Sequence, residues 1–286
     1  MNGINFVLNL LQVLNHIKMK IKTIIATGAV SLALVACVTN PITGRKSVQI
    51  VGNDQLSAMG VQEYQTALSK AKVITNTTDA TRVKNVGIRI KNAATNYYKS
   101  IGREADLQGY NWEFNLLEDK QLNAWCMPGG KVAFYTGIMP VCKDETGIAV
   151  VMGHEVSHAL AGHGNERISQ AMIAQYGGAI AGGVISNEKL QQIFQVAYPI
   201  GAQGVLLKYG RNQELEADKM GLYLMAMAGY DPRQAKPFWQ RMEAQSSGSR
   251  QPEFLSTHPN PETRMADIDK NLPTALEYYK AAGGKL

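Results

Sequence analysis

The 286-residue sequence has little basic patterning, with no run of lysines and arginines and no stripe that alternates basic and aromatic residues. Its formal net charge of +6 overstates the basicity, because residues 1–37 contain three lysines and no acid. Residues 38–286 carry 26 basic and 23 acidic side chains. We therefore expect no nucleic-acid-binding surface. The sequence also has no internal repeat, which excludes a helical-repeat tail.

Long uninterrupted apolar runs are also lacking in the body of the chain. The most hydrophobic stretch, residues 167–207, is broken at Gln175 and again at Asn187-Glu188-Lys189. It falls short of the roughly 20 apolar residues that a membrane span requires. The stretch predicts two helices joined near Ser186, either packed in the domain or forming a mobile flap, with a membrane hairpin as the alternative. The composition, 45% hydrophobic and 18% charged, fits a globular protein with a substantial core.

The beginning of the chain has the features of a secretory signal. Met19-Lys20-Ile21-Lys22 is positively charged, and the apolar residues 23–36 that follow are too few for a comfortable membrane span. The segment ends in Leu34-Val35-Ala36-Cys37, which resembles a bacterial lipobox. We therefore expect Cys37 to be lipidated and to anchor a periplasmic protein to a membrane, with the outer membrane of a Gram-negative cell as our expectation. Residues 1–18 would then be an upstream extension from a mis-assigned start codon.

Cysteine is scarce, and only Cys126 and Cys142 remain after Cys37. An exported protein lies where disulfides persist, so these two could pair. Sequence spacing does not fix the distance between their Cα atoms, and two separate buried thiols are the alternative.

The remaining sequence predicts a tether over residues 38–52 and a single domain over 53–286. Apolar residues recur at helical spacing over 53–72 and 81–98, and strand-like alternation occurs over 112–117 and 131–136. Between the two strands, Asn123-Ala124-Trp125-Cys126-Met127 runs into a Pro-Gly-Gly break, which is typical of a sheet edge. An edge strand leaves N–H and C=O groups free to pair with an extended peptide.

The most informative motif is His154-Glu155-Val156-Ser157-His158, an instance of HExxH. On a helix, His154 and His158 lie one turn apart on the same face, so both imidazoles can bind one metal ion. Glu155 beside them can accept a proton from an activated water. Asp144 is a suitable helix cap before this segment, and Gly162 and Gly164 mark its end. This context favours a metal site over two solvated surface histidines.

A catalytic zinc site needs a third protein ligand and an open position for water. The residues three and six positions beyond His158 are Ala161 and Gly164, which excludes the metzincin pattern, and we interpret His163 as a structural neighbour. Glu214 and Asp218 lie one turn apart on a later predicted helix, whereas Glu216 faces elsewhere. We predict Glu214 as the third ligand and Asp218 as an acceptor that orients a ligating imidazole.

Four motifs in order carry a family resemblance: Asn123-Ala124 with Pro128-Gly129-Gly130, HEVSH, Glu214-Leu215-Glu216-Ala217-Asp218, and Ser256-Thr257-His258-Pro259 followed by Arg264. Together they resemble the HtpX and CAAX-prenyl-protease group of zinc metallopeptidases, family M48, and above all its periplasmic lipoprotein and mitochondrial Oma-type members. The resemblance runs from about Asn40 to Arg264. It implies an α+β, mainly helical gluzincin fold with a small sheet whose edge strand lines the active site.

The resemblance also implies roles for individual residues. One Zn²⁺ would be held by His154, His158 and Glu214, with Glu155 as the base. His258 would help to bind the oxyanion, Arg264 would brace this region, and Asn123, Ala124 and Trp125 would hold the substrate backbone. Cys126 lies in the edge-strand motif, where a thiol could pair with Cys142 or cap the zinc.

The expected function is hydrolysis of peptide bonds in unfolded or misfolded cell-envelope proteins. An envelope chaperone or assembly factor with little peptidase activity is the alternative, and a zinc-stabilised binding module is a third possibility. The oligomeric state does not follow from the sequence.

Overall fold

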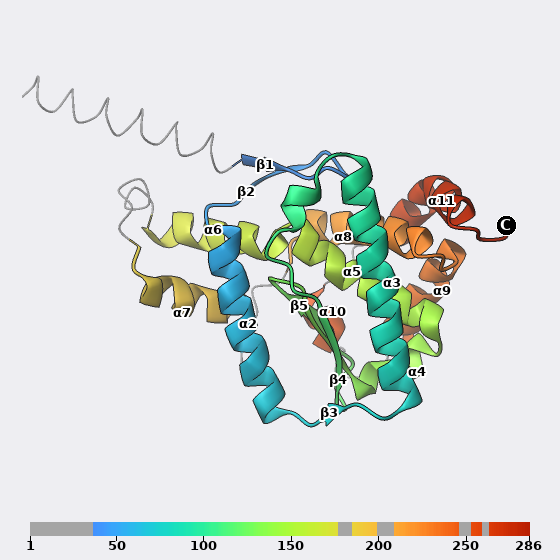
Figure 1. Ribbon diagram of the computed structural model, residues 1–286, viewed down its shortest axis with the longest axis horizontal. Coiled ribbons are helices and arrows are strands. Elements are labelled where there is room, and N and C mark those ends of the chain that lie inside the picture. The colour runs from blue at the N-terminus through green and yellow to red at the C-terminus, as the bar shows by residue number, and fades with distance from the viewer. Residues whose placement is uncertain (1–36, 177–184, 199–208, 246–252, 259–262) are drawn as a thin grey trace, which may run out of the picture.

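The computed structural model describes residues 37–176, 185–198, 209–245, 253–258 and 263–286. The predicted signal segment before Cys37 and parts of the 167–207 stretch lie outside these ranges. The described residues form mainly helices around a small sheet (Figure 1). The predicted α+β, mainly helical class is therefore confirmed.

Two long helices lie on either side of the first strand of the main sheet in the chain, as the periodicity predicts. They are α2 (Asn53–Lys70) and α3 (Thr78–Ser100). The side chain of Thr77 caps α3 by accepting a hydrogen bond from the Ala80 N–H. The apolar stripe of α3, which includes Val83, Val86 and Ile90, is fully buried in the main core. These stripes are therefore core surfaces, which fixes both helices against the sheet.

The main sheet has four strands in the order β3-β4-β6-β5. The strands are β3 (Val73–Ile74), β4 (Glu113–Leu117), β5 (Ala124–Met127) and β6 (Lys131–Tyr135). Strand β6 runs parallel to β4 and antiparallel to β5. Gly129 and Gly130, both with φ near +80°, make the turn from β5 to β6. As predicted, β5 is an edge strand of this sheet.

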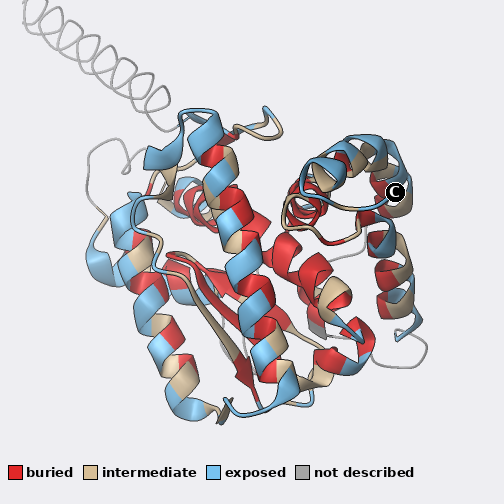
Figure 2. Cartoon of the chain, turned by 45° about the vertical axis from the view of Figure 1, so that its right-hand side comes forward, coloured by how far each residue is buried: buried red, intermediate tan, exposed pale blue. Residues whose placement is uncertain are grey.

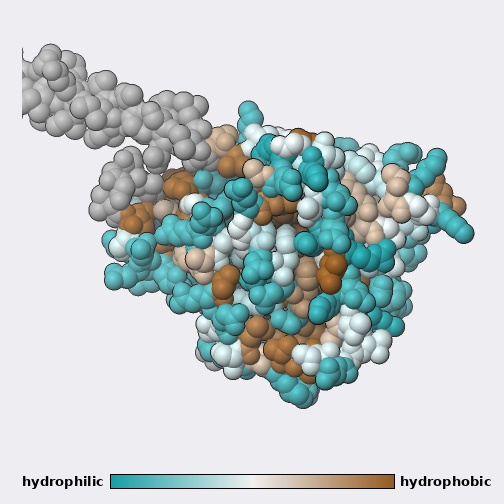
Figure 3. Space-filling model, viewed as in Figure 1, coloured by the Kyte–Doolittle hydropathy of each residue, from teal (hydrophilic) through white to brown (hydrophobic). Residues whose placement is uncertain are grey.

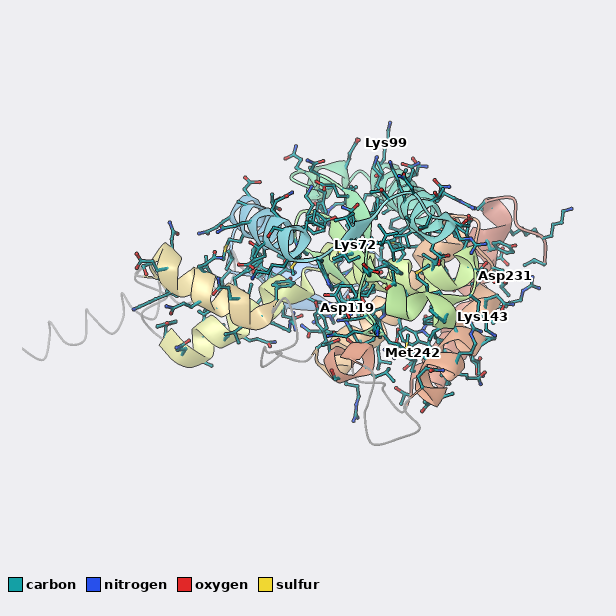
Figure 4. The ribbon with its side chains drawn as sticks, turned by 90° about the horizontal axis from the view of Figure 1, so that it is seen from below. Lys72, Lys99, Asp119, Lys143, Asp231 and Met242 are labelled. Atoms are coloured by element: carbon teal, nitrogen blue, oxygen red, sulfur yellow. The ribbon has the colours of Figure 1, made fainter. Side chains whose placement is uncertain are left out.

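The helices that follow the sheet build the centre of the domain. They are α4 (Met139–Cys142), α5 (Glu145–Leu160), α8 (Arg211–Met227), α9 (Ala235–Ala244), α10 (Glu253–Thr257) and α11 (Arg264–Ala281). Short 3-10 turns occur at Glu104–Leu107, Thr136–Ile138 and Pro232–Gln234. Helix α5 is buried almost throughout its length (Figure 2). Charged side chains such as Lys99 and Lys143 instead extend from the periphery (Figure 4). The molecule is thus organised around α5 and α8.

The segment over residues 38–52, predicted as an extended tether, contains a short hairpin bound to the domain. Strands β1 (Cys37–Thr39) and β2 (Lys46–Val48) pair antiparallel. In the turn between them, the Asn40 Oδ1 accepts hydrogen bonds from the main-chain N–H groups of Ile42 and Thr43. Arg45 donates to both carboxylate oxygens of Glu166, at 2.8 and 2.7 Å. The turn is therefore bound to α6 (His163–Tyr176), the next helix after α5.

The stretch predicted as two helices forms α6 (His163–Tyr176) and α7 (Asn187–Ala197), with Ser186 capping α7. Both helices pack against α2 through a second apolar cluster that includes Met59, Ile168 and Phe194. None of the helices within the described ranges combines the length and the apolar composition needed to cross a membrane. The described parts of α6 and α7 therefore belong to the domain.

Candidate metal centre

Helix α5 presents the two histidines of the HEVSH motif inside the protein. Asp144 caps the helix by accepting a hydrogen bond from the Gly147 N–H at 2.9 Å, as the sequence predicts. His154 and His158 are 1% and 2% exposed. Their Nε2 atoms lie 3.0 Å apart. The imidazoles therefore converge on one point, which is the arrangement that a shared metal ion requires.

Helix α8 crosses α5 at a pair of glycines. A methyl group on Gly153 would lie 2.7 Å from the carbonyl oxygen of Gly221, and one on Gly221 would lie 2.8 Å from the main-chain nitrogen of His154. Only glycines allow this close approach of the two backbones. As a result, the acidic face of α8 lies directly against the histidines of α5.

The carboxylate of Glu214, the predicted third ligand, lies beside both histidines. Its Oε1 lies 3.5 Å from the Nε2 of His158, and its Oε2 lies 3.6 Å from the Nε2 of His154. Asp218 accepts a hydrogen bond from the Nδ1 of His154 at 2.9 Å. This contact places the proton on Nδ1 and leaves Nε2 free for a metal.

A fourth donor, His258, joins the group. Ligand atoms of His154, His158, Glu214 and His258 all lie within 4.8 Å of one another, and all four residues are buried. Imidazole nitrogens with one carboxylate oxygen suit zinc and other transition metals. The Oε1 of Glu155 is buried without a hydrogen-bond partner, and it lies 3.5 Å from the Nε2 of His258. The four donors therefore fit a metal ion, and the unpaired carboxylate oxygen of Glu155 fits a polar molecule bound beside it.

Burial and neighbouring charges shift the pKa values of Glu155, His154 and His158. Burial raises the pKa of Glu155, and the nearby carboxylate of Glu214 raises it further. Burial would lower the pKa of His154, but the hydrogen bond to Asp218 and the charge of Glu214 raise it overall. For His158, burial and the neighbouring His154 both lower the pKa. A neutral His158 can bind a metal, and a Glu155 of raised basicity suits proton transfer.

Arg264 contacts the carboxylates of Asp218 and Glu214. Its Nε donates to Asp218 at 2.6 Å, and its Nη2 donates to Glu214 at 2.9 Å. The guanidinium is fully buried and stacks on Trp239 at 3.9 Å. Arg264 therefore compensates the two buried carboxylates and fixes their orientation.

His163 orients the second histidine of the motif. Its Nε2 lies 2.9 Å from Glu216, and its Nδ1 lies 2.8 Å from the Nδ1 of His158. When the Nε2–H of His163 donates to Glu216, its Nδ1 can accept from His158, which leaves the Nε2 of His158 free for a metal. Glu216 does face away from Glu214, as predicted, but it reaches the metal centre through His163. Arg45 and Thr43 of the hairpin also hydrogen-bond Glu216.

A narrow cleft leads from the edge strand to the donor group. It is lined by residues Asn123 to Met127, Glu155, Arg167, Ala197, Tyr198, Tyr209, Thr257 and His258. The main chain of Cys126 hydrogen-bonds Glu155, so β5 directly contacts the acid of the motif. The predicted substrate-binding residues Asn123, Ala124 and Trp125 therefore lie at the cleft.

Sequence reasoning missed two residues of this cleft. The ring of Tyr209 lies 3.8 Å from that of His158 and 4.9 Å from that of His258. The guanidinium of Arg167 lies over the Tyr209 ring at 3.7 Å. Neither residue belongs to a recognisable motif, and the available signal is that Tyr209 lies two residues before α8, the helix that carries Glu214.

Of the two alternatives for Cys126 and Cys142, a bridge or two separate buried thiols, the structure has the second. Both are free, one on β5 and the other on α4, and both are buried in the main core. Burial raises the pKa of each thiol, which keeps both protonated. Cys126 is also absent from the group of converging metal donors, so it does not cap the site. Cys37 is exposed at the start of β1.

Comparison with known proteins agrees with this geometry. A model of peptidase family M48 matches residues 89–272. The mitochondrial metalloendopeptidase OMA1 of Schizosaccharomyces pombe is 35% identical over 179 residues, which cover 62% of this chain and 51% of that protein. The human OMA1 is 27% identical over 83% of this chain and 46% of its own length. A putative beta-barrel assembly-enhancing protease of Vibrio cholerae is 30% identical over 54% of this chain and 33% of its own. The chain thus spans about half the length or less of these relatives.

Proposed function

The chain belongs to peptidase family M48, and from this premise we propose that it is a zinc-dependent endopeptidase of misfolded or damaged cell-envelope proteins. The observation that carries the proposal is the buried donor group of His154, His158 and Glu214, with Glu155 beside it, at the end of a cleft formed by an edge strand. We further propose that a lipid on Cys37 anchors the protein in the periplasm, since Cys37 ends a lipobox-like segment and is exposed.

The residues divide the work of peptide hydrolysis among them. When bound, Zn²⁺ would supply a Lewis acid that polarises the scissile carbonyl and makes water more acidic. The main chain of β5, from Ala124 to Met127, would align an extended substrate by strand addition. Glu155 would take a proton from the attacking water and deliver it to the leaving amine, a task that its raised pKa favours.

His258 is the fourth donor of the group and directly follows the short helix α10, whereas the other three donors come from the long helices α5 and α8. A catalytic zinc site uses three protein ligands and keeps one position open. We infer that His154, His158 and Glu214 would hold the metal, and that the imidazole of His258 would act on the oxyanion, as the resemblance implies.

The proposal is tested with Glu155→Gln. The variant should keep the metal, because Glu155 is not among the converging donors, and it should lose cleavage of casein by about 10² to 10⁴-fold. Metal content by elemental analysis and casein digestion with and without a chelator give the two readouts. A variant that cleaves as well as wild type would overturn the role of Glu155. A wild-type protein that binds metal but cleaves no unfolded substrate would favour the assembly-factor alternative.

A further inference from the structure

The sheet has a second open edge, on the side opposite β5. Strand β3 pairs only with Leu116 and Leu117, so within the described residues the first half of β4 has no strand beyond it. The N–H of Glu113 donates to the Gly130 carbonyl on the β6 side, at 3.0 Å. Because successive main-chain groups of a strand alternate in direction, the N–H and C=O of Phe114 point to the open side. This edge can therefore accept another strand.

A groove of about 550 Å³ runs beside this edge, between β4 and α3. One wall is aromatic, because alternate residues of the strand face the same way. The ring of Trp112 stacks on Tyr110 at 5.1 Å and on Phe114 at 6.1 Å. Gly87 of α3 leaves room for Phe114, since a methyl group there would lie 2.3 Å from the Phe114 ring. The groove thus has an aromatic wall as well as an open strand edge.

The opposite wall of the groove is positively charged. Lys84 and Lys91 line it from α3, with the exposed Ile88 between them. Seven residues of helix separate the two lysines by about 10 Å along one face. Among the described residues neither lysine forms an ion pair with an acid. The acid of the groove, Glu113, is already paired with Lys131, so its charge is compensated.

We propose that this groove binds an extended, acidic segment of a partner polypeptide, which adds to β4 as a strand. The partner's main chain would pair with that of Phe114, and its acidic side chains would meet Lys84 and Lys91. Acids two or four residues apart on one face of a strand are about 7 or 14 Å apart. The two lysines are about 10 Å apart along the helix, and their flexible side chains can reach acids at either spacing.

The proposed groove is separate from the metal centre. The two lie at opposite edges of the sheet, because β4 and β6 separate β3 from β5. Helix α3 packs on β4 (Figure 1), and Figure 3, drawn from the same side, shows hydrophobic and hydrophilic side chains mixed on this face. The proposal does not depend on peptidase activity, and it can fail while that activity stands.

The test uses the full chain carrying Glu155→Gln, so that no probe is cleaved. The probe is a short fluorescent peptide of alternating valine and aspartate, with blocked ends, and its binding is followed by anisotropy. Lys84→Glu with Lys91→Glu should weaken binding by about tenfold, because two attractions become repulsions. The matched control, Lys70→Glu with Lys99→Glu, changes net charge equally on α2 and α3 outside the groove and should leave affinity unchanged.

Hydrogen exchange provides the structural readout. The peptide should slow exchange of the Phe114 amide and leave amides of β5 unaffected. Equal loss of affinity in both double variants would show general charge attraction and overturn the proposal. Protection of β5 in place of β4, or an elution volume that shifts to a dimer with the groove protected in the absence of peptide, would also overturn it.

Discussion

The crossing of α5 and α8 can be tested by a single methyl group. In Gly153→Ala the new carbon would lie 2.7 Å from the Gly221 carbonyl oxygen, against an ordinary contact of at least 3.4 Å. Both neighbours are backbone, so the helices must separate by about 0.7 Å. Overpacking of this kind costs about 1 to 3 kcal/mol, whereas alanine at an unobstructed helix position would stabilise by about 1 kcal/mol. The net loss of stability should therefore be small.

The loss of metal affinity should be large in comparison. His154 follows Gly153 directly and Glu214 lies on the other helix, so the separation moves one ligand away from the other. Metal–ligand distances tolerate only about 0.2 Å, and we expect zinc affinity to fall by about tenfold to a hundredfold. Competition with a chromophoric chelator measures the affinity, and thermal unfolding of the metal-free protein measures the stability.

A matched control lies at the start of α8. In Gly210→Ala the methyl would meet only Gln213, at 3.8 Å, so zinc affinity should be unchanged. If Gly153→Ala binds zinc like wild type and unfolds at an equal or higher temperature, the close approach of α5 and α8 is refuted.

Two further outcomes follow from the polar network and the metal site. Burial would raise the pKa of Glu166, but hydrogen bonds from Arg45 and Gln213 hold it below its ordinary value of 4.5. Its contribution to stability is therefore complete above pH 4.5 and is lost as the pH falls below that value. In denaturant titrations, the free energy of unfolding of Glu166→Gln should fall by about 1 kcal/mol less on acidification than that of wild type, because Arg45 is partly exposed. An equal fall in both proteins would contradict the assignment. Removing zinc with a chelator should lower the unfolding temperature by about 5 to 10 °C when zinc is at a hundredfold excess over its Kd, and an unchanged midpoint in scanning calorimetry would mean that the buried donors bind no metal.

The pairs of site residues that share one helix could be predicted, because their members are one helical turn apart in the sequence. His154 and His158 share a helix face, as do Glu214 and Asp218, and the caps and glycines mark where each helix begins and ends. The edge position of β5 also followed from local sequence, through its Pro-Gly-Gly break.

Contacts between distant segments could not be predicted in this way. Arg45 meets Glu166 and Glu216 across more than a hundred residues, and no periodicity connects them. The link from Glu216 through His163 to His158 combines residues on three helices. The state of Cys126 and Cys142 likewise depends on the relative placement of a strand and a helix, which spacing alone does not give.

The hairpin of β1 and β2 leaves no flexible linker between a lipid on Cys37 and the domain. Strand β1 begins at Cys37 itself and pairs with β2, whose turn is fastened through Arg45 to α6 and α8. Under the proposed lipidation, the domain would stay at a fixed distance and orientation relative to the bilayer, because no flexible linker separates it from the lipid. Substrates would then be selected by how close to the membrane surface their unfolded segments emerge.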